Sequence, residues 1–340
     1  MKCMMLLCCV FLSVVLQAQN PAADTLKAKL SRAHTPAEKV DLLGKLARSS
    51  MGSNPAESDK YAEQMNREAE ISRERPLMVK ALLINGDRFS YLSFKKENVT
   101  KSIEYYNQAL ELARKNEMDK ETAQAYLGLS AIYTKVPDFD KALNYNTQAL
   151  SYISNLKSDT LKVTVYNTFG GIYQLKTERI LALRNYLTAL RIAEEAKNSY
   201  LLRTCYSNLS SFYADLKEFD KAIDYAMRSM NQLAVYHPEN EKYMRTIDNY
   251  SIGTLYMHKK DYDMSVYYYE KSIRLADSLK FAQLKMPAYE GLLQQYISQE
   301  MPRKALDLLN TRPEYKKHAE NFGIGYMIDG AYGAIYNKLG

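Results

Sequence analysis

The side chains that most often perform catalysis or bind metals are few in this sequence and far apart along it. Its four histidines stand alone, and no two form an H-x-x-x-H pair that would place two metal ligands on one helix turn. The chain has no glycine-rich phosphate loop, no G-x-S-x-G turn and no neighbouring cysteine and histidine. Adjacent carboxylates such as Glu194 and Glu195 fall on a predicted helix, where a solvated surface explains them. The sequence therefore predicts a protein that is not an enzyme and has no cofactor and no metal site.

Tyrosine is the one functional side chain in excess, with 29 tyrosines against 9 phenylalanines and no tryptophan. Runs of tyrosine occur at 105–106 and 267–269. In each run one tyrosine falls at the aromatic position of an internal repeat. This placement favours packing between helices over an aromatic cage for a ligand.

Two markers recur along the chain with a common period near 40 residues. A small residue opens each period, and the intervals are 40 residues with a single one of 43: Ala62, Ser102, Ala142, Ala182, Ala222, Ser265 and Ala305. A tyrosine recurs with nearly the same period, at intervals between 40 and 43 residues: Tyr91, Tyr133, Tyr173, Tyr213, Tyr256, Tyr296 and Tyr336. Two independent markers that share one period predict a repeat architecture.

Within one period the spacing is that of two helices joined by a short turn. Tyr166, Phe169, Gly170 and Tyr173 follow the i, i+3, i+4, i+7 pattern of one helix face, and a second apolar stripe runs from 182 to 190. The turns carry an acidic–aromatic–acidic run at 138–140, 218–220 and 261–263. Acidic side chains suit a helix N-terminus, because they cap free backbone amides and meet the positive end of the helix dipole.

These residues resemble the tetratricopeptide repeat. That family has a large residue, a small residue, a tyrosine, an alanine nine positions later, and then an aromatic and an alanine; residues 166–189 fit each of these positions. The likeness extends over about residues 38–340, although the period of 40 is longer than the 34 residues of the common repeat. It implies an all-α fold, a right-handed α-solenoid of stacked antiparallel helix hairpins with a concave groove.

The first 18 residues have the pattern of a signal peptide. Lys2 supplies a positive charge, an apolar run extends over 4–16, and Leu16-Gln17-Ala18 offers a cleavage site. The run is shorter than the roughly 20 residues that a membrane-spanning helix needs. We therefore expect an exported protein, periplasmic or secreted after cleavage near Gln19.

The rest of the chain divides into two parts. Residues 19–75 are interpreted as a degenerate N-terminal capping helix pair, and residues 76–340 as an array of about five to six repeats ending in a half repeat. Gly333 and Tyr336 match the first helix of another repeat. This half repeat is either a terminal cap or, as we expect, a sign that the native chain continues past Gly340.

Charge and the remaining cysteine exclude several classes of site. The formal net charge is +7, but basic and acidic residues alternate along the chain and no strong basic cluster occurs, which argues against a nucleic-acid partner. No later segment has 18 consecutive apolar residues, so no membrane span is expected within 1–340. Cleavage of the signal peptide would leave Cys205 as the sole cysteine, and its place in a predicted helix favours a small buried side chain over a reactive thiol.

The family resemblance also implies a binding groove. In that family the first helix of each pair lines the concave face, and the corresponding positions here are Gln124, Leu127, Thr164, Asn167, Gln174, Ser207, Ser211, Asp215, Tyr250, Thr254 and Met257. The set is small, polar and nearly uncharged, and it lacks the lysines that would clamp a terminal carboxylate. The packing positions of the repeat lie on the other helix face, so these polar groups indicate either a ligand-binding surface or a merely solvated concave face. We expect a protein or peptide ligand, held by amide hydrogen bonds and apolar anchors.

The sequence thus predicts a non-catalytic protein- or peptide-binding module, the periplasmic sensor or interaction region of a membrane-linked signalling protein. One alternative is a free-standing secreted scaffold that assembles envelope proteins. A glycan-binding solenoid is a further alternative, against which the absence of tryptophan argues. The sequence beyond Gly340 would separate a sensor from a scaffold, because a sensor would continue into a membrane span.

Overall fold

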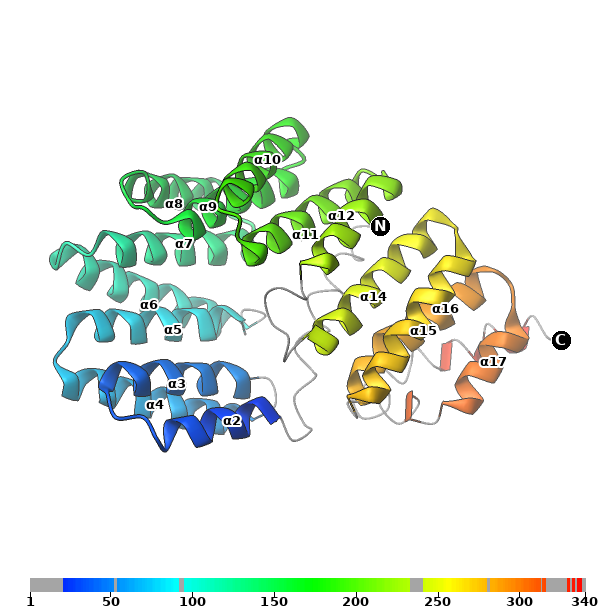
Figure 1. Ribbon diagram of the computed structural model, residues 1–340, viewed down its shortest axis with the longest axis horizontal. Helices are drawn as coiled ribbons and strands as arrows, with labels where there is room; N and C mark the ends of the chain where they lie inside the picture. The colour runs from blue at the N-terminus through cyan, green and yellow to red at the C-terminus, as the bar shows by residue number, and fades with distance from the viewer. Residues whose placement is uncertain are drawn as a thin grey trace. The chain divides into compact units, whose positions relative to one another are not determined.

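The computed structural model describes residues 21–51, 54–91, 95–232, 241–279 and 282–312, with short pieces at 314–315, 329–330, 332–333 and 335–337 (Figure 1). Within these ranges all regular structure is helical and no strand occurs, as the repeat pattern predicted. The predicted signal peptide, His237, His318 and Gly340 lie outside the described residues.

The chain forms two compact units, residues 1–196 and 197–340. The described helices of unit 1 are α2 Pro21–Leu30, α3 Pro36–Ser50, α4 Pro55–Ser72, α5 Arg75–Tyr91, α6 Lys96–Lys115, α7 Asp119–Lys135, α8 Phe139–Ile153, α9 Asp159–Leu175 and α10 Arg179–Glu195. Those of unit 2 are α11 Ser199–Asp215, α12 Phe219–Asn231, α14 Glu241–Lys259, α15 Tyr262–Ser278, the short 3₁₀ helix η1 Ala282–Lys285, α16 Met286–Ser298 and α17 Pro302–Thr311.

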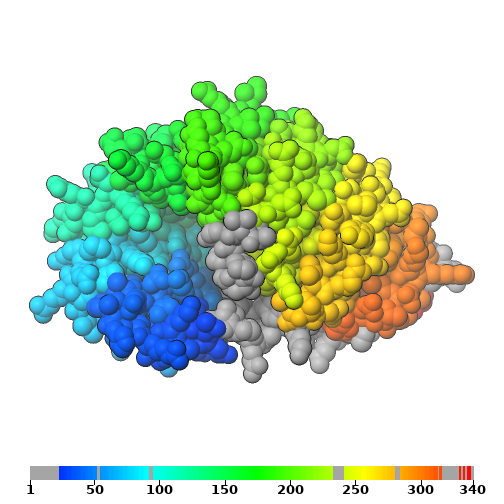
Figure 2. Space-filling view, in the orientation of Figure 1, coloured from blue at the N-terminus to red at the C-terminus, as the bar shows by residue number. Residues whose placement is uncertain are grey.

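Consecutive helices pack as hairpins, and within each unit the hairpins stack in sequence order. In unit 1 the pairs are α3–α4, α5–α6, α7–α8 and α9–α10, and in unit 2 they are α11–α12, α14–α15 and α16–α17. Within unit 1 the first helices α3, α5, α7 and α9 also contact one another in order, so they line one continuous layer. The colour bands of unit 1 follow one another from blue to green without a gap between successive hairpins (Figure 2). This arrangement confirms the predicted all-α solenoid of helix hairpins.

The recurring tyrosine marks the end of each first helix for a backbone reason. The carbonyl oxygens of Tyr133, Tyr173, Tyr213 and Tyr256 each accept a hydrogen bond from the backbone N–H five residues later, at 3.0, 2.8, 2.9 and 3.0 Å. In the α9–α10 turn Thr177 adopts φ of 62°, the left-handed conformation that lets the chain reverse. This six-to-one closure satisfies a carbonyl that the helix end would leave free. The period near 40 residues therefore recurs in the backbone hydrogen bonds of the turns as well as in the buried side chains.

The small residue of the first helix allows a close approach between the two helices of a hairpin. A Cβ on Gly170 would lie 2.5 Å from the Tyr186 ring, and one on Gly253 would lie 2.8 Å from the Tyr269 ring. Where the small residue is serine, as at Ser130, its Oγ donates to a carbonyl of the second helix, here that of Ala142 at 2.8 Å. Tyrosine thus fills the gap left by glycine.

One marker in the predicted repeat is misplaced. Tyr91 was assigned to the tyrosine position of α5, but its side chain is 40% exposed. Phe89 takes that position, because its ring stacks on Tyr105 with centroids 5.6 Å apart, as Tyr133 stacks on Tyr145 at 5.5 Å in the next hairpin. The longer connection between α5 and α6 shifts the aromatic residue of α5 relative to the start of α6. The nearly regular spacing of the tyrosines concealed this shift.

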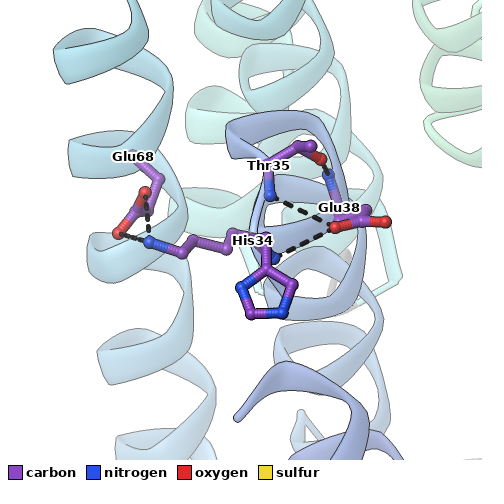
Figure 3. Close-up of polar contacts among 5 residues, drawn as sticks. His34, Thr35, Glu38 and Glu68 are labelled. Atoms are coloured by element: carbon purple, nitrogen blue, oxygen red, sulfur yellow. Dashed lines mark hydrogen bonds and ion pairs between the residues drawn. The ribbon is translucent and has the colours of Figure 1, made fainter. Parts of the chain in front are cut away.

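Helix α3 begins with a full capping box (Figure 3). Thr35 Oγ1 accepts from the N–H of Glu38 at 3.2 Å, and the Glu38 carboxylate accepts from the N–H groups of Thr35 and His34 at 3.2 and 3.1 Å. These backbone hydrogen bonds hold the pKa of Glu38 below its usual range. Lys39 on the same helix reaches Glu68 of α4 at 3.4 Å. The pair α3–α4 is thereby fixed at its start.

Candidate ligand-binding face

The predicted groove residues of unit 1 lie on two first helices that contact each other, α7 and α9. Gln124 is half-buried on α7, and Leu127 packs against a hydrophobic cluster around Tyr126. On α9, Thr164 is exposed and Asn167 is half-buried. The Thr164 hydroxyl donates to the carbonyl of residue 160 at 2.8 Å, which leaves its oxygen free to accept.

Gln174 has a structural role that the sequence did not indicate. Its Oε1 accepts a hydrogen bond of 2.7 Å from the hydroxyl of Tyr186, whose ring is 4% exposed. A buried tyrosine hydroxyl requires a partner, since an unmade hydrogen bond there costs about 1–3 kcal/mol. The ring enters from the second helix through the space that Gly170 leaves open, so its hydroxyl arrives at the first helix. The polar group at this position is therefore required by packing.

The same arrangement recurs in unit 2 around Tyr269, which is fully buried. Its hydroxyl lies 3.2 Å from Thr254 Oγ1 and 3.8 Å from Met257 Sδ. Its ring lies against Tyr250, with centroids 6.0 Å apart. Three predicted groove residues of unit 2 thus surround one buried side chain.

The other predicted residues of unit 2 lie on α11 and are exposed. Ser207 Oγ is 2.8 Å from the hydroxyl of Ser229 on α12. Ser211 and Asp215 are exposed near the end of the helix. Cys205, on the buried face of the same helix, is fully covered, which confirms its assignment to the core.

Charged residues of α3 and α5 extend the first-helix layer, and the sequence argument missed them. Asp41 on α3 pairs with Lys80 on α5 at 3.0 Å. Seven residues further along both helices, Arg48 pairs with Asp87 at 3.2 Å. Asp87 also accepts a 2.8 Å hydrogen bond from the buried Tyr106 hydroxyl, and desolvation raises the pKa of its carboxyl. The interpretation of residues 19–75 as a degenerate cap concealed these two ion pairs. Both join residues that are 39 apart, a spacing close to the repeat period that could have indicated them.

A largely buried ion pair joins two first helices of unit 2. Arg203 on α11 and Asp248 on α14 lie 3.0 Å apart, with side chains 18% and 14% exposed. Burial raises the pKa of Asp248, while the Arg203 guanidinium opposes that rise. Because both charges are desolvated, the cost of burying them offsets much of the attraction between them, so the pair adds little net stability.

The described part of the chain contains no cluster of metal-binding side chains. No three His, Cys, Asp or Glu side chains among the described residues gather closely enough to hold a metal ion. The half-buried His258 stacks on Phe219 with ring centroids 6.1 Å apart, and burial lowers its pKa. None of the described helices has the length and apolarity to cross a membrane.

Comparison with known proteins agrees with this geometry. Models of the tetratricopeptide repeat match residues 90–152, 204–231 and 249–278. No curated protein matches the sequence in direct comparison.

Solved structures with the same type of fold match most of the chain at low sequence identity. A signal-transduction ATPase with a tetratricopeptide-repeat sensor, from Pyrococcus horikoshii, is 16% identical with a TM-score of 0.54 over 94% of this chain and 55% of its own. The apo form of RapI is 15% identical with a TM-score of 0.52, over 89% of this chain and 85% of its own. The Rap conjugation gene regulator of plasmid pLS20, in complex with the Phr* peptide, is 14% identical with a TM-score of 0.52, over 90% and 95%. At such identities the likeness concerns the fold.

Proposed function

This chain is built from tetratricopeptide repeats, and we propose that it is a non-catalytic module that binds a protein or peptide on its first-helix layer. The observation that carries the proposal is the surface formed by α7 and α9. These helices contact each other and present Gln124 and Thr164, which are accessible, polar and uncharged. Amide and hydroxyl groups of this kind can bond the backbone of an extended segment without selecting a charged side chain.

The similar structures support this assignment at the level of the fold. One holds the Phr* peptide, and another Rap protein, 17% identical with a TM-score of 0.50 over 89% of this chain and 97% of its own, is complexed with Competence and Sporulation Factor. A solenoid of hairpins that stack in order offers an extended face of the length a peptide needs.

The test compares a double substitution with a single substitution on the same layer. Gln124→Ala with Thr164→Ala should lower binding to an array of soluble peptides several-fold, as loss of about 1–2 kcal/mol implies, and leave the melting temperature unchanged. Gln174→Ala should instead lower the melting temperature, because it strips the partner from the Tyr186 hydroxyl. Tyr250 is a poor choice for this test, since it packs on Tyr269. Unchanged peptide binding by the first variant would place the ligand elsewhere.

We further propose that the protein is exported and acts in the periplasm, as the sensor or interaction region of a membrane-linked signalling protein. The support is the charge and apolar run of residues 2–18 together with the peptide-binding type of fold. Amino-terminal sequencing of envelope material should find a chain that starts near Gln19. A genomic sequence that continues past Gly340 into an apolar run of about 20 residues supports the sensor, and a stop codon there would favour the free scaffold.

A further inference from the structure

The second helix of hairpin α9–α10 exposes a stripe unlike those of its neighbours. Ile180, Arg184, Leu187 and Arg191 recur at three- and four-residue spacing on one face of α10, and all four side chains are exposed. Ile180 is 85% exposed and Leu187 is 44% exposed. Apolar side chains on a solvated helix face need an explanation when they line up in this way.

The repeat itself supplies the comparison. One period earlier, the same four positions on α8 are Asp140, Asn144, Thr147 and Ser151, and one period before that, on α6, they are Thr100, Glu104, Asn107 and Glu111. Those side chains are also exposed, although the next hairpin of unit 1 stacks on each of those two. The position is thus solvated by the geometry of the repeat, and the fold does not require Ile or Leu there.

The turn between α9 and α10 also has apolar residues at exposed positions. Leu175 at the end of α9 is 52% exposed, and Leu181 occupies the position that holds Lys141 on α8. The Lys141 ammonium lies 5.1 Å from the centroid of the Tyr133 ring. Leu181 carries no charge, so it cannot form the corresponding cation–π contact. Hairpin α9–α10 therefore replaces charged positions of its neighbour with apolar ones at several places on one surface.

We propose that this stripe of α10 is a docking surface for an acidic amphipathic helix of a partner protein. Ile180 and Leu187 are seven residues apart, about 10.5 Å along the helix, and Arg184 and Arg191 have the same spacing. A helix laid along α10 would bury its own heptad-spaced apolar residues against the first pair and set carboxylates beside the second. Arg191 is bonded to Glu195 at 2.8 Å with both groups well exposed, and no described residue forms an ion pair with Arg184. The basic and apolar positions thus define the charge and the spacing of the partner.

The same chemistry argues against a membrane as the occupant. A helix that lies in a bilayer surface needs a wide apolar face with its basic residues at the edges. Here Arg184 lies in the middle of the stripe, between Ile180 and Leu187, and Glu194 and Glu195 follow at its end. A partner helix can place a carboxylate opposite that central arginine, whereas an acyl layer cannot.

The experiment uses the full chain and a synthetic probe helix with leucines at heptad spacing flanked by glutamates, together with a scrambled peptide of the same composition. Binding is followed by fluorescence anisotropy at low and moderate salt. The probe should bind more tightly than its scramble, and more weakly as salt rises. Replacing Ile180→Asp and Leu187→Thr, the residues of α8, should weaken binding roughly tenfold or more. Replacing Arg184→Asn and Arg191→Ser should weaken it several-fold and remove most of the salt dependence.

A transplant provides the matched control. Asp140→Ile, Asn144→Arg, Thr147→Leu and Ser151→Arg would give α8 the stripe of α10, and this variant should bind the probe even when the stripe on α10 has been replaced. All these positions are exposed, so melting temperatures should remain those of the unaltered chain.

Four results would overturn the proposal. The first is equal binding of the probe and the scrambled peptide. The second is a clear fall in melting temperature for Ile180→Asp with Leu187→Thr, because that would mean that the chain itself covers this face. The others are binding to vesicles of phosphatidylcholine and phosphatidylglycerol without binding to the probe, and self-association of the chain that the same double substitution abolishes.

Discussion

Hairpins α7–α8 and α9–α10 have first helices that are offset by 40 residues and equal in length, yet they are closed by different contacts. In the first, Ser130 donates to the second helix and Asn146 donates to the carbonyl of residue 165 on the following helix at 2.9 Å. In the second, the Tyr186 ring occupies the space beside Gly170. The backbone period tolerates both arrangements. Tyr186 contacts the first helix of its own hairpin, whereas Asn146, one period earlier, bonds the first helix of the next hairpin.

The turns of the two hairpins differ as well. In α7–α8 the Tyr133 ring stacks on Tyr145, and Lys141 lies over Tyr133. In α9–α10 the second-helix position of Tyr145 holds Asn185, whose Nδ2 donates to a carbonyl of its own helix at 2.8 Å. A repeat thus has a shared framework, the turn and the small residue, and positions that are free to differ. The free positions are where one hairpin can acquire a surface that its neighbour lacks.

The largest expected effect contrasts Tyr186 with Asn146, the residue at the same position one period earlier. Tyr186→Ala should lower the free energy of unfolding by about 3–5 kcal/mol, because a buried ring is lost and a cavity remains. Asn146→Ala should cost about 1–2 kcal/mol, mainly for one hydrogen bond and a smaller volume. Urea unfolding of both variants measures the difference. Equal losses would mean that the two hairpins are closed by the same kind of contact after all.

A smaller effect separates two adjacent glycines of α9. Gly170→Ala should destabilise by about 1–3 kcal/mol, since its Cβ would lie 2.5 Å from the Tyr186 ring. Gly171→Ala should stabilise by about 0.5–1 kcal/mol, because its Cβ would meet only the Tyr186 hydroxyl at 3.7 Å and alanine favours a helix. Opposite signs in thermal unfolding support the close approach at Gly170. A stabilising effect of Gly170→Ala would contradict the close approach of the Tyr186 ring to Gly170.

The turn of α9–α10 offers a change of about 1 kcal/mol. Thr177 holds φ of 62°, which is unfavourable for a β-branched side chain, so Thr177→Gly should raise the free energy of unfolding by up to about that amount. Thr177→Ala keeps a Cβ and should gain less. Lys217, with φ of 61° at the same place in the α11–α12 turn, should respond to glycine in the same way.

The smallest expected effect is a pH dependence confined to one helix start. Hydrogen bonds from the side chain and the backbone of Lys141 hold the pKa of Asp138 below its usual range. The stability from this cap is therefore present above the unfolded pKa, near 3.9, and lost as pH falls through the lower folded pKa. Asp138→Ala should remove that acid-sensitive part of the melting temperature. Glu178, the corresponding residue of α10, makes no side-chain cap hydrogen bond, so Glu178→Ala is the control.

The core of the repeat could be predicted from the sequence because it depends on spacing along one helix. Tyr166, Phe169, Gly170 and Tyr173 lie on one face of α9 for the reason that 3.6 residues make a turn. The aromatic position of α5 was missed, since only the contact between Phe89 and Tyr105 shows which residue the longer connection brings into place.

The candidate binding face was predicted less completely, and the reason is physical. Gln174 and Thr254 lie where the family resemblance placed them, on first helices. Their partners are hydroxyls of tyrosines on second helices, which reach them across the hairpin. No periodicity along one helix reports a distance between two helices. A polar residue at a groove position can therefore serve the core, a ligand or both.

The sequence by itself determined the period of the chain, the two helices in each unit of that period, the turns between them and the small residues that let them approach. These depend on backbone geometry and side-chain size, which are local properties. Only the tertiary structure decided which polar side chains already have partners and which apolar ones stay in solvent. Gln174 is engaged while Thr164 can still accept a bond, and Ile180 is exposed while Ala182 is buried. That division depends on which groups from different helices come within bonding or contact distance when the hairpins pack.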